Sequence, residues 1–367
     1  VKTAIEFIDE NEKVLILYGD VPLIRKSTLI KLFSLNDSLS ILTANVSDPT
    51  GYGRVLKDSN GLVEEIIEEK DTNEQQKNIK EIFTGVMAVK GKILRELIPL
   101  INNNNASREY YLTDLIGIAN SNGFKIETLS VSWEETLGAN TRSEQEKLEQ
   151  TYRKMKNEEL LKKGITLIDK NRIDVRGELQ AGVDCTIDIN VIFEGKVELG
   201  NNVKIGANTI ITNTKIGDNS EILPFSHIDS SHIGKDCFIG PYARLREGSE
   251  IADGARIGNF VETKKAKIGQ STKANHFTYL GDAEIGNDVN IGAGTITCNY
   301  DGENKNKTEI GDGSFIGTNS SLIAPVTIGK NAYVGAGSTI TKDVPDSSLG
   351  ISRAKQKNIK DWSKNKK

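Results

Sequence analysis

The sequence contains few cysteines and few aromatic residues, and each scarcity argues against a class of protein. Three cysteines occur among 367 residues, Cys185, Cys237 and Cys298, and no two of them have C-x-x-C spacing. Neither a disulfide framework nor a cysteine-ligated zinc site is expected, and a reducing, cytoplasmic compartment fits best. Aromatic residues make up 6% of the chain against 34 glycines. That balance favours many short strands and tight corners over a helical bundle.

Long apolar runs and a strong charge imbalance are also missing. No run approaches the roughly 18 apolar residues that span a bilayer, and no signal peptide opens the chain, so membrane insertion is not expected. The net charge of -4 gives no reason to expect a nucleic-acid partner. The chain begins at Val1 rather than Met, inside a stretch (1–9) with a helical pattern. We therefore expect a fragment that lacks its N-terminal segment.

Residues 1–141 alternate between helix-like and strand-like patterns, which predicts an α/β domain with mixed strand order. The apolar run Val14–Tyr18 precedes Gly19-Asp20 and is typical of a strand buried on both faces of a parallel sheet. Other strands are expected at 39–46, 53–56, 63–68 and 82–89, and helices at 26–35 and 94–100.

Residues 142–165 predict a charged helix that links two domains. Ser143 and Glu146 form a capping-box pattern, and the helix should continue to about Lys163. Leu148, Tyr152, Met155 and Leu160 would lie near one face.

Residues 166–345 are built from six-residue repeats. Branched aliphatic residues recur in steps of six, with an occasional five, and glycine often follows them, as in Ile205-Gly, Ile216-Gly, Ile239-Gly and Ile257-Gly. This period cannot be a helix face. It predicts a parallel β-helix in which three hexapeptides form one coil, with the aliphatic side chains inside and small residues at the corners. Residues 346–367 form a basic C-terminal tail.

The repeat is interrupted by a mostly polar stretch, 293–308. A β-helix tolerates an insertion only where the chain leaves the edge of a coil, and such loops usually serve binding. The interruption therefore marks the candidate site.

Several motifs resemble one bacterial enzyme family over the whole chain. They are Tyr18-Gly-Asp-Val-Pro-Leu23, Asp48-Pro-Thr-Gly-Tyr-Gly-Arg54, Glu109-Tyr-Tyr-Leu-Thr-Asp114, Asn275-His-Phe-Thr-Tyr-Leu-Gly-Asp282, Asn290-Ile-Gly-Ala-Gly-Thr-Ile-Thr-Cys-Asn-Tyr-Asp-Gly302 and Ile351-Ser-Arg353. The family is that of the bifunctional N-acetylglucosamine-1-phosphate uridylyltransferase/glucosamine-1-phosphate N-acetyltransferases. The resemblance implies a left-handed β-helix, a homotrimer, and acetyl transfer from acetyl-CoA to glucosamine 1-phosphate. It also implies uridylyl transfer from UTP, with Mg²⁺, to form UDP-N-acetylglucosamine for cell-wall precursor synthesis.

The acetyl-transfer chemistry needs a base, and histidine titrates in the required range. Of the three histidines, the motif match assigns this role to His276. The substrate amine would attack the thioester directly, so no nucleophilic cysteine or serine is required. The resemblance places the oxyanion donor at the backbone N–H of Ala293.

The resemblance also assigns the binding residues of this half. Phosphate-binding positions match Arg246 and Lys264, and sugar-contacting positions match Tyr279, Asn290 and Lys305. The acetyl-CoA positions match Ala293, Asn299, Tyr300, Thr318, Ala336 and Arg353. Thr318 replaces the serine typical of the family but keeps a hydroxyl group.

For the uridylyltransferase half, the resemblance places Tyr18, Gly19, Asp20, Gly53, Glu68 and Asn140 at the nucleotide sugar, with Asp20 and Asn140 as the Mg²⁺ ligands. Two features depart from the family. The motif Leu-Ala-Ala-Gly-x-Gly-Thr-x-Met and the Arg and Lys that follow it do not occur before Asp20, and Phe83 stands where a polar contact residue is expected. We therefore expect no UTP-dependent turnover from the chain as given, which a pyrophosphate-release assay would check.

Three other interpretations remain open. A γ-type carbonic anhydrase shares the β-helix and binds zinc with two histidines five residues apart, the spacing of His227 and His232. Its third histidine should lie upstream, whereas His276 lies downstream. A glucose-1-phosphate adenylyltransferase has a shorter β-helix without the Asn275–Tyr279 motif. A non-catalytic solenoid that serves only trimer assembly is the third.

Overall fold

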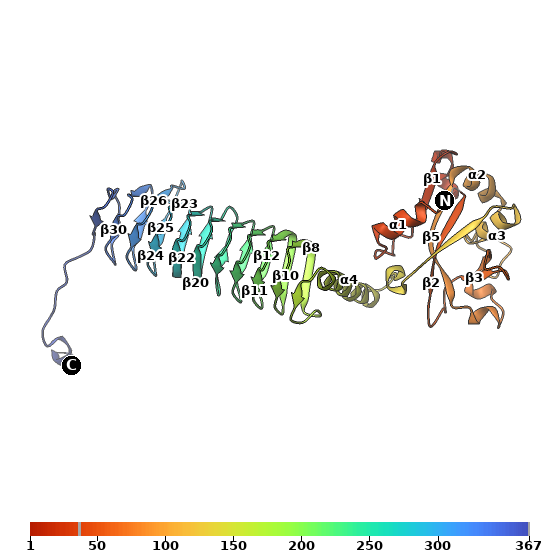
Figure 1. Ribbon diagram of the computed structural model, residues 1–367, viewed down its shortest axis with the longest axis horizontal. Helices are drawn as coiled ribbons and strands as arrows, with labels where there is room; N and C mark the ends of the chain where they lie inside the picture. The colour runs from red at the N-terminus through yellow and green to blue at the C-terminus, as the bar shows by residue number, and fades with distance from the viewer. Residues whose placement is uncertain (36–37, 366–367) are drawn as a thin grey trace. The chain divides into compact units, whose positions relative to one another are not determined.

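The computed structural model describes residues 1–35 and 38–365. The chain forms two compact units, Val1–Tyr152 and Arg153–Lys367. We describe each unit by itself, because their mutual placement is not determined (Figure 1).

The first unit contains a mixed sheet with the strand order β4-β3-β5-β2-β6, and β1 pairs with β5. Its strands are β1 (Lys13–Ile16), β2 (Leu39–Asn45), β3 (Arg54–Lys57), β4 (Val63–Ile67), β5 (Glu81–Lys90) and β6 (Ile126–Val131). In the part of this sheet that the structure describes, β2 and β6 are a parallel pair and the other pairings are antiparallel. This confirms the predicted α/β class.

The first unit also contains α-helical and 3₁₀-helical segments. They are η1 (Lys2–Phe7), α1 (Lys26–Phe33), η2 (Glu69–Asp71), η3 (Gln76–Asn78), α2 (Gly91–Leu97), η4 (Ile98–Leu100), α3 (Asp114–Ser121) and η5 (Trp133–Thr136). The main core joins Ile41 and Met87 of the sheet to Leu94 and Leu115 of the helices. Leu32 of α1 belongs to a second cluster with Leu42 and Val86.

The expectation for Val14–Tyr18 was wrong in two respects. Strand β1 pairs antiparallel with β5, and its four residues are only half-buried. Leu17 and Tyr18 lie beyond the strand and are exposed. An apolar run indicates burial but not the direction of the partner strand, and β5 is the sole partner of β1 in the described sheet. The helix expected within residues 1–9 is present as the short 3₁₀ helix Lys2–Phe7.

The long helix α4 (Arg142–Lys162) begins with a capping box two residues earlier than predicted. The hydroxyl of Thr141 accepts the N–H of Glu144 at 3.2 Å, and the Glu144 carboxylate accepts the N–H of Thr141 at 2.9 Å. The pattern Thr141-x-x-Glu144 satisfies the same rule as Ser143-x-x-Glu146. Sequence spacing alone could not choose between the two registers.

The second unit is a parallel β-helix, as the hexapeptide period predicts (Figure 1). Its longer strands are β8 (Ile173–Ala181), β10 (Val191–Leu199), β20 (Arg256–Lys264) and β22 (Lys273–Gly281). The others are β7 (Thr166–Leu167), β9 (Thr186–Ile187), β11 (Lys204–Ile205), β12 (Ile210–Thr212), β13 (Lys215–Ile216), β14 (Glu221–Ile222), β15 (His227–Asp229), β16 (His232–Ile233), β17 (Phe238–Ile239), β18 (Arg244–Leu245), β19 (Glu250–Ile251), β21 (Lys267–Ile268), β23 (Ala283–Ile285), β24 (Asn290–Ile291), β25 (Ile296–Cys298), β26 (Thr308–Ile310), β27 (Phe315–Ile316), β28 (Ser321–Ile323), β29 (Val326–Ile328), β30 (Tyr333–Val334), β31 (Thr339–Ile340) and β32 (Leu349–Gly350).

Each strand pairs in register with the strand one coil later, so the aliphatic residues form continuous ladders inside the prism. Ile205 pairs with Ile222, and Ile222 pairs with Ile239. These side chains are almost fully buried in one core that extends from Leu160 to Val344. Leu349–Gly350 pairs with β30, so the last coil extends past residue 345. A short 3₁₀ helix, η6 (Trp362–Asn365), follows in the tail.

The corners of the prism are made by residues with left-handed backbone, where asparagine and glycine are favoured. Asn208 (φ 59°) and Asn319 (φ 55°) have this conformation at one corner. None of the helices within residues 1–35 and 38–365 combines the length and apolarity needed to cross a bilayer.

Candidate functional site

One corner of the β-helix brings five polar or small residues into a single column. Strands β20 and β22 pair Asn259 directly with His276. The column continues through Ala293, Thr318 and Ala336, because each next coil donates a backbone hydrogen bond to it: Asn319 N–H to the Ala293 carbonyl at 2.7 Å, and Gly337 N–H to the Thr318 carbonyl at 2.8 Å. We call these five residues the His276 column.

Four acetyl-CoA candidates lie along this corner. Ala293, Thr318 and Ala336 are members of the column, and the Arg353 guanidinium donates to the Ala336 carbonyl at 2.7 Å. Within the described residues, the N–H of Ala293 has no hydrogen-bond acceptor. An oxyanion donor must have an unpaired N–H, and the Ala293 residue as a whole is half-buried.

His276 is exposed, and within residues 1–35 and 38–365 its ring makes one hydrogen bond. Its Nδ1 lies 2.9 Å from Oδ1 of Asn259. Its backbone carbonyl accepts the hydroxyl of Thr278 at 2.7 Å, which fixes the corner beneath the ring. The imidazole edge that carries Nε2 is therefore left for a ligand.

Positive side chains gather on the face next to the column. The pKa of Lys264 lies below the usual lysine range, mainly because of the charge of Lys305 and further because of Arg246. Arg246 pairs with the Glu262 carboxylate at 2.7 Å and is close enough to Tyr279 to interact electrostatically. The structure thus brings together the candidates for the sugar phosphate, and their mutual repulsion favours an anion among them.

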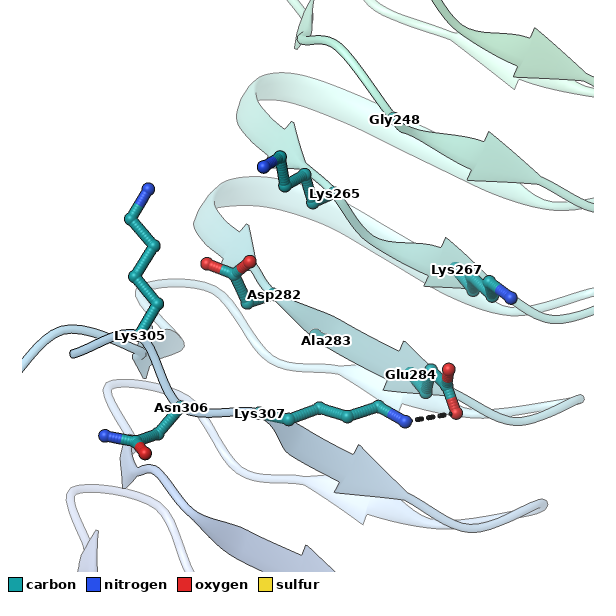
Figure 2. A pocket seen from close by; sticks show the side chains of 9 residues that line it. All are labelled: Gly248, Lys265, Lys267, Asp282, Ala283, Glu284, Lys305, Asn306 and Lys307. Atoms are coloured by element: carbon teal, nitrogen blue, oxygen red, sulfur yellow. Dashed lines mark ion pairs between the residues drawn. The ribbon is translucent and has the colours of Figure 1, made fainter.

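The inserted loop borders a pocket of about 330 Å³. Figure 2 shows Lys265, Asp282 and Lys305 around it, with Lys307 paired to Glu284 at 2.6 Å. Its lining residues are Gly248, Lys265, Lys267, Asp282, Ala283, Glu284, Lys305, Asn306 and Lys307. The loop therefore places Lys305 beside the cationic face.

Two acetyl-CoA candidates do not join the His276 column. Asn299 and Tyr300 follow β25, whereas Ala293 precedes it. They therefore lie at opposite edges of the same face. Asn299 is 8% exposed and donates to the Asp282 carboxylate at 2.5 Å. Tyr300 is exposed. Asn290 lies on β24, before the corner, whereas Tyr279 lies after it.

The first unit brings several uridylyltransferase candidates together, since Tyr18 lies near Asp20 and Glu68. Partial burial raises the pKa of Tyr18, and the nearby carboxylates of Glu68 and Asp20 raise it further. A Cβ at Gly53 would lie 2.8 Å from Cγ2 of Ile66 and 3.7 Å from the Glu68 carboxylate, so a side chain there would press on Ile66. Glu68 also accepts the Thr113 hydroxyl at 2.8 Å. Gly19 adjoins Tyr18 in the sequence.

Asp20 and Asn140 start from neighbouring backbone, because the N–H of Ala139 donates to the Asp20 carbonyl at 3.2 Å. Carboxylate and amide oxygens are ligands that suit Mg²⁺, which usually takes one or two protein ligands beside substrate phosphates. The donor set therefore fits the ion.

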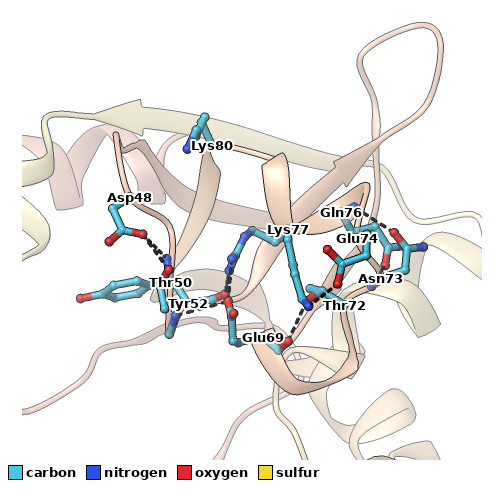
Figure 3. Close-up of polar contacts among 12 residues, drawn as sticks. Asp48, Thr50, Tyr52, Glu69, Thr72, Asn73, Glu74, Gln76, Lys77 and Lys80 are labelled. Atoms are coloured by element: carbon cyan, nitrogen blue, oxygen red, sulfur yellow. Dashed lines mark hydrogen bonds and ion pairs between the residues drawn. The ribbon is translucent and has the colours of Figure 1, made fainter.

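The Asp48–Arg54 motif is held by its own polar contacts (Figure 3). Asp48 accepts the hydroxyl and the N–H of Thr50 at 2.7 and 3.1 Å, which lowers the pKa of its carboxyl group. Arg54 is 1% exposed and pairs with Glu69 at 2.5 Å. Arg54 therefore fixes the loop next to Gly53 rather than facing solvent.

Phe83, which departs from the family pattern, belongs to the hydrophobic core of the sheet and is 5% exposed. Its side chain is therefore part of the apolar core rather than an exposed polar contact. Gly85, two residues later, has φ 84°, and a Cβ there would lie 2.1 Å from the Tyr18 ring. Gly85 was missed from sequence, because only the fold places the ring of Tyr18 over it.

Asn259 and Asp282 were also missed. Both belong to a repeat in which polar corner residues are common, so their types carry no signal. Their roles emerge only from the register that sets Asn259 beside His276 and Asp282 beside Asn299.

The geometry gives no support to a zinc site. His227 pairs across the sheet with Ile210 and Arg244, and His232 pairs with Lys215 and Glu250, so neither has a histidine neighbour. Burial, and then the charge of Arg244, lower the pKa of His227. Among the residues that the structure describes, no group of three His, Cys, Asp or Glu side chains could hold a metal ion.

Comparison with known proteins links both halves of the chain to one group. The family described as bacterial transferase hexapeptide (six repeats) matches residues 230–265 and 307–342, and the hexapeptide repeat of succinyl-transferase matches 182–213 and 196–222. The bifunctional protein GlmU of Idiomarina loihiensis is 51% identical over 365 residues, which cover 99% of this chain and 80% of that protein. The proteins of the same name from Cellvibrio japonicus and Aromatoleum aromaticum are 50% and 46% identical, over 99% and 98% of this chain and 81% and 80% of theirs.

Proposed function

The chain belongs to the family of bifunctional GlmU proteins, and from that membership we propose how its residues carry out the family's reactions. The β-helix transfers the acetyl group of acetyl-CoA to the amine of glucosamine 1-phosphate, and the second reaction of the full-length family protein is uridylyl transfer. The observation that supports the residue roles best is the His276 column, where an exposed imidazole precedes an unpaired backbone N–H.

We assign the general base to His276. The amine nitrogen of the sugar attacks the thioester carbonyl, and Nε2 takes the proton that the nitrogen loses. The carbonyl oxygen gains negative charge, which the Ala293 N–H stabilises. Collapse of this intermediate forms the amide and expels the CoA thiolate, which the imidazolium can protonate.

The binding roles follow the arrangement of charge. Arg246, Lys264 and Lys305 hold the phosphate dianion, and Tyr279 and Asn290 contact the sugar. Thr318, Ala336 and Arg353 extend the corner on which acetyl-CoA would lie, and Asn299 with Tyr300 offers contacts at the other edge of the face. Release of free CoA, with glucosamine 1-phosphate and not with water as acceptor, tests this assignment.

For the first unit we propose that Tyr18, Gly19, Gly53 and Glu68 contact the nucleotide sugar. Asp20 and Asn140 would hold Mg²⁺, which neutralises phosphate charge when it is bound. We place the protein in the cytoplasm, since its three cysteines are all free thiols.

We also propose a homotrimer, and an exposed aromatic ladder supports it. Phe225, Tyr242, Phe260 and Phe277 occupy successive coils at the His276 corner and are 47–71% exposed. The first three stack with ring centroids 4.9 and 5.3 Å apart. All four have left-handed backbone, φ 40–62°, which costs bulky residues about 1–2 kcal/mol each. The aromatic rings recur once per coil. A second copy of the chain, with its coils parallel to the first, presents rings at the same spacing.

The ladder gives a prediction for assembly. In the double variant Tyr242→Asn/Phe260→Asn, asparagine suits the same backbone, as Asn208 does one coil before Phe225, while the aromatic surface is lost. We expect the variant to remain folded. The concentration below which its trimer dissociates into monomers should be about 10-fold or more higher than for the wild type. Multi-angle light scattering over a dilution series measures this. A wild type that is monomeric throughout would refute the trimer, and an unchanged variant would refute the role of the ladder.

A further inference from the structure

The side chain of Asn259 is the only one that hydrogen-bonds to the His276 ring within the described residues. The two residues lie opposite each other on β20 and β22, one coil apart. At the equivalent position the two preceding coils carry Pro224 and Pro241. The hydrogen bonds from the Phe225 N–H to the Ala207 carbonyl and from the Tyr242 N–H to the Pro224 carbonyl establish this register. Ala293 occupies the next coil. Of the two coils that flank His276 at this corner, the preceding one therefore carries the polar residue Asn259 and the following one carries an alanine.

The contact uses the ring nitrogen that the reaction does not need. A neutral imidazole has one N–H donor and one acceptor nitrogen. If Nδ1 donates to Oδ1 of Asn259, then Nε2 is unprotonated and can accept the amine proton. If the Asn259 amide were turned to donate, Nε2 would carry the hydrogen and could not act as a base. The acceptor arrangement is also kept after protonation, because the imidazolium still donates from Nδ1.

We propose that Asn259 is a positioning residue that fixes the tautomer and the ring direction of His276 by accepting its Nδ1–H. This inference rests on the proposed general-base role of His276. Asn259 is half-buried on β20 and its side chain hydrogen-bonds to the His276 ring, so we infer that it acts through the histidine. As a neutral acceptor it orients the ring without adding the negative charge that a carboxylate would bring.

Two substitutions separate orientation from charge. Asn259→Ala removes the acceptor, and we expect kcat to fall about 10–100-fold because a misdirected base loses its alignment. KM for glucosamine 1-phosphate should change less than about twofold. Asn259→Asp keeps an acceptor and adds negative charge, which favours the imidazolium. The acidic limb of the kcat/KM–pH profile should therefore move about one unit to higher pH, while most of kcat at high pH is retained.

The other charged and titratable groups on the neighbouring strands are the same in both variants and in the wild type. They are Arg256, Glu262 and Lys264 on β20, Lys273 and Tyr279 on β22, Arg244 on β18, and Cys298 on β25. A difference between the pH profiles of the variants therefore reports the group at position 259.

Asn287→Ala is the matched control. Asn287 is another corner asparagine, and its Oδ1 accepts the N–H of Gln270 from the neighbouring coil at 2.8 Å, at a different corner. Its loss removes a similar contact between coils and should leave kcat unchanged. Melting temperature and trimer content show that each variant is folded.

The outcomes distinguish this inference from the proposed function. If the wild type forms no product, the function itself fails. If the wild type and Asn287→Ala are active and Asn259→Ala has the kcat of the wild type, the positioning role is wrong. The same holds if Asn259→Ala is impaired but Asn259→Asp shows no displacement of the acidic limb, because a merely structural role would give that result.

Discussion

His276→Ala should lower kcat for acetyl transfer by about 10²–10⁴-fold, the range that a positioned general base contributes. KM for both substrates should change little, because the imidazole takes a proton rather than holding the phosphate or the CoA. Steady-state release of CoA, measured from pH 5 to 9, gives both constants. The acidic limb of the wild-type profile should be absent from the residual rate of the variant.

His232→Ala provides the control for this prediction. His232 is exposed on β16, on another face of the β-helix, and pairs with Lys215 and Glu250 rather than with site residues. It should retain wild-type kcat. If His276→Ala also retained nearly full activity, the mechanism proposed for this site would be refuted.

Lys264→Ala should raise KM for glucosamine 1-phosphate by about 10–100-fold, because one of three cations around the phosphate is removed. The effect should vanish with glucosamine, which lacks the phosphate. Lys215→Ala, on a different face, is the matched control and should leave KM unchanged. An equal loss with both acceptors would show that Lys264 does not bind the phosphate.

The pH dependence of KM follows from the same cluster. Lys305 and Arg246 disfavour the charged form of Lys264, so its pKa lies below the usual lysine range. As pH rises, Lys264 loses its proton earlier than an isolated lysine would, and phosphate binding weakens. KM for glucosamine 1-phosphate should therefore rise at alkaline pH. Lys264→Arg should remove that rise, because a guanidinium stays charged, and an unchanged rise in this variant would contradict the assignment.

The β-helix could be predicted from sequence because its signal is repeated many times. Each hexapeptide contributes one buried aliphatic residue, and errors at single positions do not disturb the period. The α/β unit gave a weaker signal. Five of its strands were predicted to within a few residues, but β6 was not predicted. The direction of β1 depends on β5, which lies about 70 residues later in the chain. No local pattern contains that pairing.

The site shows the same division between local and non-local information. His276 and the interrupted repeat stand out in the sequence, since histidine is rare and the polar insertion breaks the period. Asn259 does not stand out, because its importance depends on being one coil away from His276. Likewise, the capping box at Thr141 and the close approach of Tyr18 to Gly85 depend on the backbone path.

The aromatic ladder lies between these cases. Its members occur at nearly constant spacing, so the sequence contains the signal. The hexapeptide pattern, however, is defined by the inward-facing aliphatic residues and not by the outward-facing aromatic ones. Their exposure and left-handed backbone became evident only in the fold.

The most direct test of the central claim is the fate of a labelled acetyl group. The purified chain is incubated with [¹³C₂-acetyl]-CoA and glucosamine 1-phosphate, and the products are resolved by mass spectrometry and NMR. The account predicts N-acetylglucosamine 1-phosphate with both labelled carbons in an amide on the sugar nitrogen, formed in equal amount to free CoA. Labelled acetate alone, or unchanged acetyl-CoA with folded protein, would contradict it.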